Sequence, residues 1–126
     1  PANAPDHWDL IEGQGSLFHP SFAGVTLGLI HGAQPDAMVL CHEPSRTHMR
    51  GLPDWPLPEL SHCLETNLAA ARLTNPDVFC AGVAVNTSAL GDEAAAKILG
   101  EISDKMELPC TDPMRNGVAP IVDRLF

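Results

Sequence analysis

A carboxylate followed by a glycine turn stands near the beginning of the chain. Glu12 ends a short apolar segment and precedes the turn Gly13-Gln14-Gly15-Ser16. We expect a strand over residues 7–12, with Glu12 at its carboxyl end, where open α/β sheets bind their ligands. There the carboxylate could act as a base or hold Mg²⁺ through water, and the amides of Gly13 and Gly15 could bind an anion. The alternative is a carboxylate that only accepts hydrogen bonds from the turn.

Cationic and polar side chains after this turn are candidates for binding an anionic substrate. A guanidinium group offers a planar fork that matches a carboxylate or phosphate. The alternative is that the arginines neutralise nearby carboxylates, although the chain has only seven basic residues against sixteen acidic ones. The candidates are His19, Ser21, Arg46, His48 and Arg50.

Two later polar segments follow predicted strands. Asn86 and Thr87 come directly after the apolar run 78–85, and they either orient a ligand or cap the following turn. Asp112 and Arg115 flank a proline, and they either contribute to the site or form a local ion pair. With Ser16 and Ser21, these four residues complete the predicted substrate-binding set.

The cysteines and histidines do not suggest a disulfide framework or a metal site. The four cysteines lie far apart, and we expect Cys41 and Cys80 to be buried, which argues against a cysteine nucleophile. A zinc site would require C-x-x-C or H-x-x-x-H spacing. The residues that would have to supply it lack this spacing: Cys41, His42, His48, His62 and Cys63.

Apolar runs alternate with segments of helical period along the chain. The predicted strands cover residues 7–12, 36–42, 78–85 and 108–111. The predicted helices cover residues 22–31, 58–73, 92–106 and 118–125. Residues 43–58 show neither period, and we expect a long functional loop there.

This order predicts a three-layer α/β fold, a parallel sheet with helices on both faces. The run Ala37-Met38-Val39-Leu40-Cys41 is continuously apolar, as in a strand buried on both faces. The polar residues after each predicted strand then lie at one edge of the sheet, which would form the ligand site. These residues are Glu12, His42-Glu43, Asn86-Thr87-Ser88 and Thr111-Asp112.

Composition excludes several classes of partner. The chain has 126 residues, 44% of them apolar and 18% charged, which suits one globular domain. A net charge of -9 repels nucleic acid backbones and anionic membranes. Because no apolar run reaches the roughly 18 residues of a membrane span, we expect a cytoplasmic protein with a small-molecule substrate.

Four segments together resemble a bacterial and archaeal family of P-loop-domain proteins, long uncharacterised, some members of which are D-glutamate N-acetyltransferases. The resemblance covers essentially the whole chain. The segments are Glu12 to Pro20, Cys41 to Arg46, Gly82 to Ser88 and Leu108 to Arg115.

The resemblance implies a partial P-loop NTPase-like fold, in which residues 1–126 form the C-terminal part of the P-loop domain. No segment matches G-x-x-x-x-G-K-[ST] or G-x-G-x-x-G, so the phosphate loop and a preceding Rossmann-like domain would lie outside these residues. The expected reaction transfers acetyl from acetyl-CoA to the amine of D-glutamate. Glu12 would be the base and His19 the second candidate, with Ser16 or turn amides stabilising the oxyanion.

Two other interpretations remain open. One is an ATP- and Mg²⁺-dependent ligase resembling dethiobiotin synthetase, whose fold also places an acidic strand end before a glycine turn. The other is a non-catalytic fragment that is inactive alone. If strands are missing from the sheet, an exposed apolar face should remain, and we expect the chain to form homo-oligomers.

Overall fold

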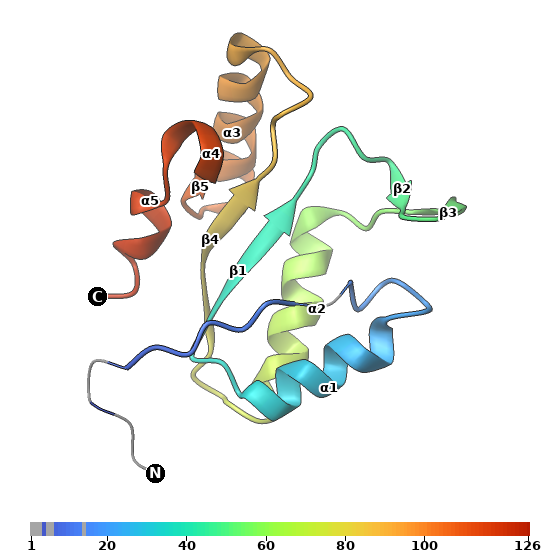
Figure 1. Cartoon of the computed structure of the whole chain (residues 1–126), viewed down its shortest axis with the longest axis vertical. Coiled ribbons are helices and arrows are strands. Elements are labelled where there is room, and N and C mark those ends of the chain that lie inside the picture. Colours follow the sequence, from blue (N-terminus) through green and yellow to red (C-terminus); the bar gives the residue numbers. More distant parts are fainter. Residues whose placement is uncertain (1–3, 5–6, 14) are drawn as a thin grey trace.

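The computed structural model describes residues 4, 7–13 and 15–126, and its centre is a three-stranded parallel sheet (Figure 1). The strand order is β1-β4-β5, and β1 pairs with β4 from Ala37↔Phe79 to His42↔Val85. The shorter β5 pairs with β4 through Val83↔Cys110 and Ala84↔Thr111. Three of the four predicted strands are confirmed. Their bounds are Ala37–His42 for β1, Phe79–Val85 for β4 and Cys110–Thr111 for β5.

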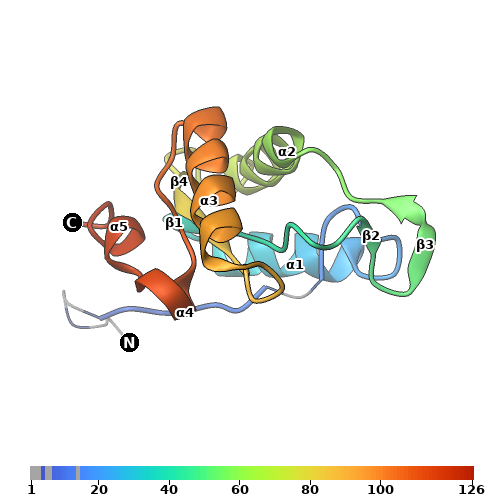
Figure 2. The same cartoon turned by 90° about the horizontal axis from the view of Figure 1, so that it is seen from above.

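The two crossover helices, α2 (Leu60–Arg72) and α3 (Asp92–Met106), cover the same face of the sheet (Figure 2). The strands advance in one direction across the sheet, and right-handed crossovers therefore place both helices on one side. Val83 and Val85 of β4 and Ile102 of α3 form a buried cluster between the sheet and these helices. Both helices were predicted from their apolar period.

The opposite face carries two short helices, α4 (Pro113–Asn116) and α5 (Ala119–Val122), where a single helix over 118–125 was expected. Ile121 of α5 is buried against β4, where a Cβ atom on Gly82 would lie 2.9 Å from its Cγ1. The fold is thus a three-layer α/β arrangement.

The outer layer does not extend over β1 in the part of the chain that the structure describes. Val39 is 44% exposed and Cys41 is also exposed, whereas Cys80 on β4 is buried. The predictions that β1 is buried on both faces and that Cys41 is buried are therefore wrong. The physical reason is that α5 packs mainly against β4 and β5.

The segment before α1 is extended but forms no strand. Residues 7–12 cross in front of the sheet instead of joining its edge (Figures 1 and 2). Trp8 packs against Phe126, with ring centroids 5.3 Å apart, and Leu10 is 90% exposed. The predicted strand is wrong because residues 7–12 lie across the face of the sheet and pair with neither of its edge strands, β1 and β5.

Helix α1 (Ala23–Ala33) confirms the predicted helix and packs against α2. Ile30, Ala71 and Val78 form the buried cluster between them. The cluster anchors the amino-terminal third of the described chain to the sheet.

The predicted loop 43–58 contains a small antiparallel hairpin, formed by β2 (His48–Met49) and β3 (Leu52–Pro56). Gly51 turns the chain between the strands with φ +77°, a conformation that glycine adopts without strain. The strands are too short for an alternating pattern to be visible in the sequence.

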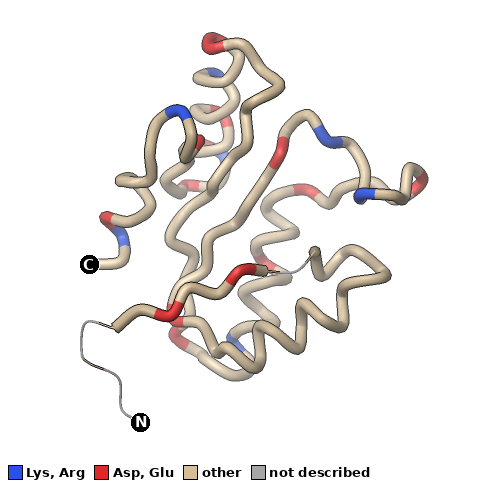
Figure 3. Tube along the Cα trace, viewed as in Figure 1, with Lys and Arg blue, Asp and Glu red and all other residues tan. Residues whose placement is uncertain are grey.

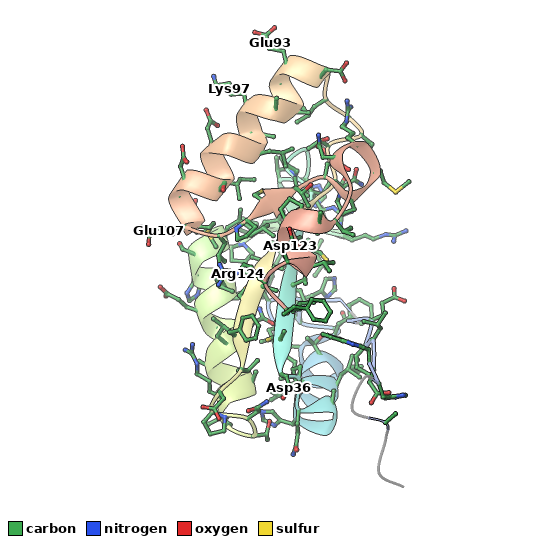
Figure 4. The ribbon with its side chains drawn as sticks, turned by 90° about the vertical axis from the view of Figure 1, so that its left-hand side faces the viewer. Asp36, Glu93, Lys97, Glu107, Asp123 and Arg124 are labelled. Carbon is green, nitrogen blue, oxygen red and sulfur yellow. The ribbon has the colours of Figure 1, made fainter. Side chains whose placement is uncertain are left out.

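The carboxyl ends of the three parallel strands lie at one edge of the sheet. Figure 4 shows the two ends of the molecule, with Asp36 before β1 at one end and Glu93 on α3 at the other. The predicted strand-end residues on β1, β4 and β5 therefore do share an edge. Within the described ranges, no helix is both long and apolar enough to cross a membrane.

Candidate functional site

A cavity of about 800 Å³ lies at the carboxyl end of β1. Its walls come from the loop before α1, the β2–β3 hairpin, the start of α2 and the residue that follows β4. We call the polar side chains of its lining the polar wall and the apolar ones the apolar wall. The polar wall includes Ser16, His42, Glu43, Arg46, Arg50 and Asn86, and the apolar wall includes Phe22, Met49, Leu57, Leu60 and Cys63.

His19 fixes the hairpin wall of this cavity. Its Nδ1 accepts a hydrogen bond from the Ser21 N–H at 3.2 Å, so Nε2 carries the proton and donates to the Arg50 carbonyl at 3.1 Å. A second hydrogen bond holds the hairpin to the same loop, since Trp55 Nε1–H donates to the Phe18 carbonyl at 3.1 Å. His19 is 7% exposed, and both ring nitrogens are occupied, so the geometry favours a structural role for it.

The two arginines of the polar wall differ in their partners. Arg46 Nη2 donates to Glu43 Oε2 at 2.6 Å, an exposed pair that fits the alternative of local neutralisation. Arg50 has no ion-pair partner among residues 7–13 and 15–126, and its guanidinium is available to an anion. Glu59, another carboxylate near the hairpin, pairs with Lys105 at 2.7 Å. Arg46 lies on the segment between β1 and β2, and Arg50 lies in the turn between β2 and β3; Figure 3 shows basic residues along this stretch of the chain.

His42 is the last residue of β1 and contributes an imidazole to the polar wall. Partial burial lowers the pKa of His42 below its ordinary 6.5, and the neighbouring Glu43 opposes this shift. The imidazole is therefore neutral at neutral pH, the state in which it can accept a proton. The sequence predicted His42 at the ligand edge of the sheet and as a possible zinc ligand, but it did not indicate a catalytic role for this residue.

Asn86 lies beside His42 at the same edge of the sheet. Its backbone N–H donates to the His42 carbonyl at 2.8 Å, which extends the β1–β4 ladder by one residue. Its side-chain Oδ1 accepts a hydrogen bond from the Ser88 N–H at 3.0 Å. Asn86 is exposed and lines the cavity, so the position predicted from the sequence is brought into the site.

Thr87 and Asp112 contact each other and do not line this cavity. The Thr87 N–H donates to Asp112 Oδ2 at 2.9 Å, and the Thr87 hydroxyl donates to the same oxygen. These hydrogen bonds hold the pKa of Asp112 at about 2, below the usual 3.8. Arg115 donates to the carbonyls of Thr87 and Leu90. Their arrangement favours a supporting role for all three predicted residues.

The remaining predicted residues lie outside the cavity wall. Glu12 is exposed and does not end a strand, so only three strand ends meet where four were expected. Gly13, Ser21 and His48 also do not line the cavity, whereas Gly15 does. His48 Nδ1 donates instead to the Met49 carbonyl at 2.9 Å. Gln14, the middle of the glycine turn, lies outside the described residues.

The apolar wall was not predicted from the sequence. Leu60 and Cys63 belong to the apolar stripe of α2, which indicated core packing; Leu60 does pack against the Val83, Val85 and Ile102 cluster, and both residues also line the cavity. Among the residues that the structure describes, no three His, Cys, Asp or Glu side chains are close enough to hold a metal ion. The site is therefore lined by cationic, imidazole and amide groups together with apolar side chains.

Comparison with known proteins identifies the group to which the chain is similar. Residues 1–122 match the family described as a domain of unknown function, the DUF1611_C P-loop domain. The chain is 54% identical to a D-glutamate N-acetyltransferase of Tritonibacter scottomollicae over 125 residues, 99% of this chain and 38% of the relative. It is 55% identical over 119 residues to a protein of the same name from a Pseudoalteromonas species, covering 94% and 36% of the two chains.

A solved structure supports the same assignment. The crystal structure of a DUF1611 family protein from Anabaena variabilis superposes with a TM-score of 0.83 at 35% sequence identity, over 90% of this chain and 34% of that one. The chain thus spans little more than a third of the length of the relatives it matches. With a match over residues 1–122, the chain belongs to the DUF1611 C-terminal P-loop domain family.

Proposed function

We propose that this chain forms the amino-acid side of an N-acetyltransferase site, which moves an acetyl group from acetyl-CoA to the amine of D-glutamate or a similar amino acid. The observation that carries the proposal is the identity of 54% and 55% to two relatives named D-glutamate N-acetyltransferase. The polar wall of the cavity supports it, because it combines the groups that an acidic amino acid requires.

The carboxylates of the amino acid would bind to the arginines of the cavity. Arg50 is the primary group, since its guanidinium has no competing carboxylate within the described residues. The Arg46 guanidinium, whose Nη2 lies 2.6 Å from Glu43 Oε2, would bind Glu43 and a substrate carboxylate at the same time. The Glu43 carboxylate could in turn accept a hydrogen bond from the substrate ammonium. Two cations and one carboxylate thus match the charges of glutamate.

His42 is the group best placed to accept the proton of the amine. Amine acylation requires a free lone pair on nitrogen, and a neutral imidazole in the cavity wall can take up the proton that is lost. Glu12 is exposed and outside the cavity, and His19 uses both ring nitrogens in the fold. His42 therefore replaces them in the proposed mechanism.

The apolar wall suits the acetyl donor. Transfer of an acetyl group requires a thioester or another activated donor. Phe22, Met49 and Leu57 offer an apolar surface for the methyl group and the uncharged part of that donor. Gly15 and Ser16 border the same cavity, and their amides are the groups we propose for a phosphate or carbonyl oxygen of the donor.

The experiment measures release of free thiol from acetyl-CoA in the presence of D-glutamate. It uses the chain as printed and a chimera in which the chain replaces the matching 38% of the Tritonibacter relative. We expect the chimera to be active with D-glutamate and inactive with a matched amine that lacks carboxylates. A folded chimera that releases no thiol beyond the uncatalysed rate would contradict the proposal.

A further inference from the structure

The side-chain amide of Asn86 has a fixed orientation. Its Oδ1 accepts a hydrogen bond from the Ser88 N–H at 3.0 Å, which closes a turn within the segment that follows β4. Because the oxygen faces this N–H, the two Nδ2 hydrogens are the part of the amide left for other partners. No residue in the described part of the chain accepts a hydrogen bond from Nδ2. Asn86 lines the cavity, and the part of its side-chain amide that has no partner among the described residues is a donor.

The backbone around Asn86 is held on both sides. Before it, the Asn86 N–H is bonded to the His42 carbonyl at 2.8 Å. After it, Thr87 is fully buried and donates two hydrogen bonds to the Asp112 carboxylate, which is itself 3% exposed. A donor held in advance stabilises a developing negative charge without a cost of reorganisation at the moment of reaction.

We infer that Asn86 Nδ2 donates to the carbonyl oxygen of the acetyl thioester and stabilises the oxyanion of the tetrahedral intermediate, with Thr87 and Asp112 as positioning residues. This inference rests on the proposed function. It assigns the donor and acceptor roles to residues at neighbouring positions of the sheet edge, since the Asn86 N–H is bonded to the His42 carbonyl.

In the reaction, the nitrogen of the neutral amine attacks the thioester carbonyl carbon. The C–N bond forms, the carbonyl π electrons move to oxygen, and His42 accepts one proton from the nitrogen. When the intermediate collapses, the C–S bond breaks and the thiolate leaves with the electron pair. The thiolate then takes the proton from the His42 imidazolium, and the products are the N-acetyl amino acid and the free thiol.

The test compares Asn86→Asp with Asn116→Asp in the active chimera. Asn86→Asp keeps an oxygen that can accept from the Ser88 N–H but replaces the Nδ2 donors with an anionic oxygen, so Asn86→Ala, which removes the donors without adding charge, is measured beside it. We expect kcat to fall by about 100- to 1,000-fold in both Asn86 variants, as when an oxyanion donor is removed elsewhere. The dissociation constant for D-glutamate should change little in Asn86→Ala, because the arginines still bind its carboxylates. Asn116→Asp makes the same chemical change at an exposed position of α4 outside the cavity lining and should retain the parent kcat.

A spectroscopic measurement addresses the hydrogen bond directly. Infrared difference spectra of bound acetyl-CoA labelled with ¹³C at the carbonyl, without the amine, should show a lower stretching frequency in the parent than in Asn86→Asp. Equal frequencies, or a kcat for a folded Asn86→Asp within about threefold of the parent, would overturn the inference while leaving the proposed function intact. An inactive parent chimera would instead end the proposed function, and the inference with it. If Asn86→Asp does not fold, the same two measurements on Asn86→Ala decide.

Discussion

Thr87 and Asp112 connect the carboxyl ends of β4 and β5 through two hydrogen bonds to one carboxylate oxygen. The Thr87 backbone N–H reaches Asp112 Oδ2 at 2.9 Å, and the Thr87 hydroxyl donates to the same atom. The other carboxylate oxygen accepts from the Met114 N–H at 2.9 Å and so caps α4. One side chain thereby holds the segment beside the cavity, the short strand β5 and the helix that follows it.

Asp112 should make the stability of the chain depend on acid pH. Its pKa is held at about 2, below the usual 3.8, so the carboxylate favours the folded state above the unfolded pKa. This contribution is lost as the pH falls from about 3.8 toward 2. We expect Asp112→Asn to lower the urea midpoint at neutral pH, and the gap between variant and parent to close at pH about 2. An equal difference in urea midpoint at neutral pH and at pH about 2 would show that Asp112 does not cause the pH dependence.

Gly82 should not tolerate a methyl group. A Cβ at this position would lie 2.7 Å from the Pro109 carbonyl oxygen and 2.9 Å from Ile121 Cγ1, so β5 or α5 would have to move. We expect Gly82→Ala to lower the free energy of unfolding by about 1–3 kcal/mol, as overpacking does. The control is Gly100→Ala, where nothing lies within 4 Å and the site is inside α3. That substitution should stabilise by about 0.5–1 kcal/mol, and urea denaturation measures both.

A comparison of predicted and observed helices and strands shows which parts of the fold can be predicted from local sequence. The helix 92–106 was predicted with the bounds observed, because its apolar period and its acidic first turn are local signals. The segment 7–12 is also apolar but pairs with neither edge of the sheet, and pairing between strands is a property of the whole fold. The hairpin is likewise held by contacts of His19 and Trp55 with residues more than 30 positions away.

In the candidate site too, positions follow from local sequence, whereas roles depend on contacts between distant residues. The sequence placed Asn86 at the end of a strand, and there the structure brings it beside His42. It also predicted Ser16, His19 and Arg46 in the site, and all three line the cavity. The role of each could not be predicted, because it depends on partners such as the Arg50 carbonyl bonded to His19. Glu12 was favoured on the assumption of a strand that does not form.

Arg50 should determine the affinity for the amino acid. Its guanidinium borders the cavity and has no carboxylate partner in the described parts of the chain. We expect Arg50→Gln to raise the KM for D-glutamate by about 10- to 100-fold, the range for a lost hydrogen bond between charged groups. Arg72→Gln, at the end of α2, makes the same change of charge outside the cavity wall and should leave KM unchanged. Steady-state kinetics of the chimera with varied D-glutamate measure both, and equal effects would remove Arg50 from the site.

His42 should set the acid limb of the pH profile. Burial lowers the pKa of His42 below 6.5, so protonation of the free imidazole occurs only at more acidic pH. The value of kcat/KM should therefore fall toward acid pH as the imidazole becomes charged, with a midpoint below 6.5. His42→Gln should reduce kcat/KM by about 100-fold or more and remove this limb. A variant that keeps the acid limb of the parent would show that another group accepts the proton.

The buried interior contains two clusters that share no residue. One joins Ile30, Ala71 and Val78 on the α1 side, and the other joins Val83, Val85 and Ile102 under α3. Both β1 and α2 run along the two clusters: Met38 and Leu68 pack against the first, and Leu40 and Leu60 pack against the second. The segment that carries Asn86 takes its support from β5 and α4 instead, through the hydrogen bonds of Asp112. Local opening of β5 and α4 would therefore loosen Asn86 while the rest of the cavity lining keeps its contacts.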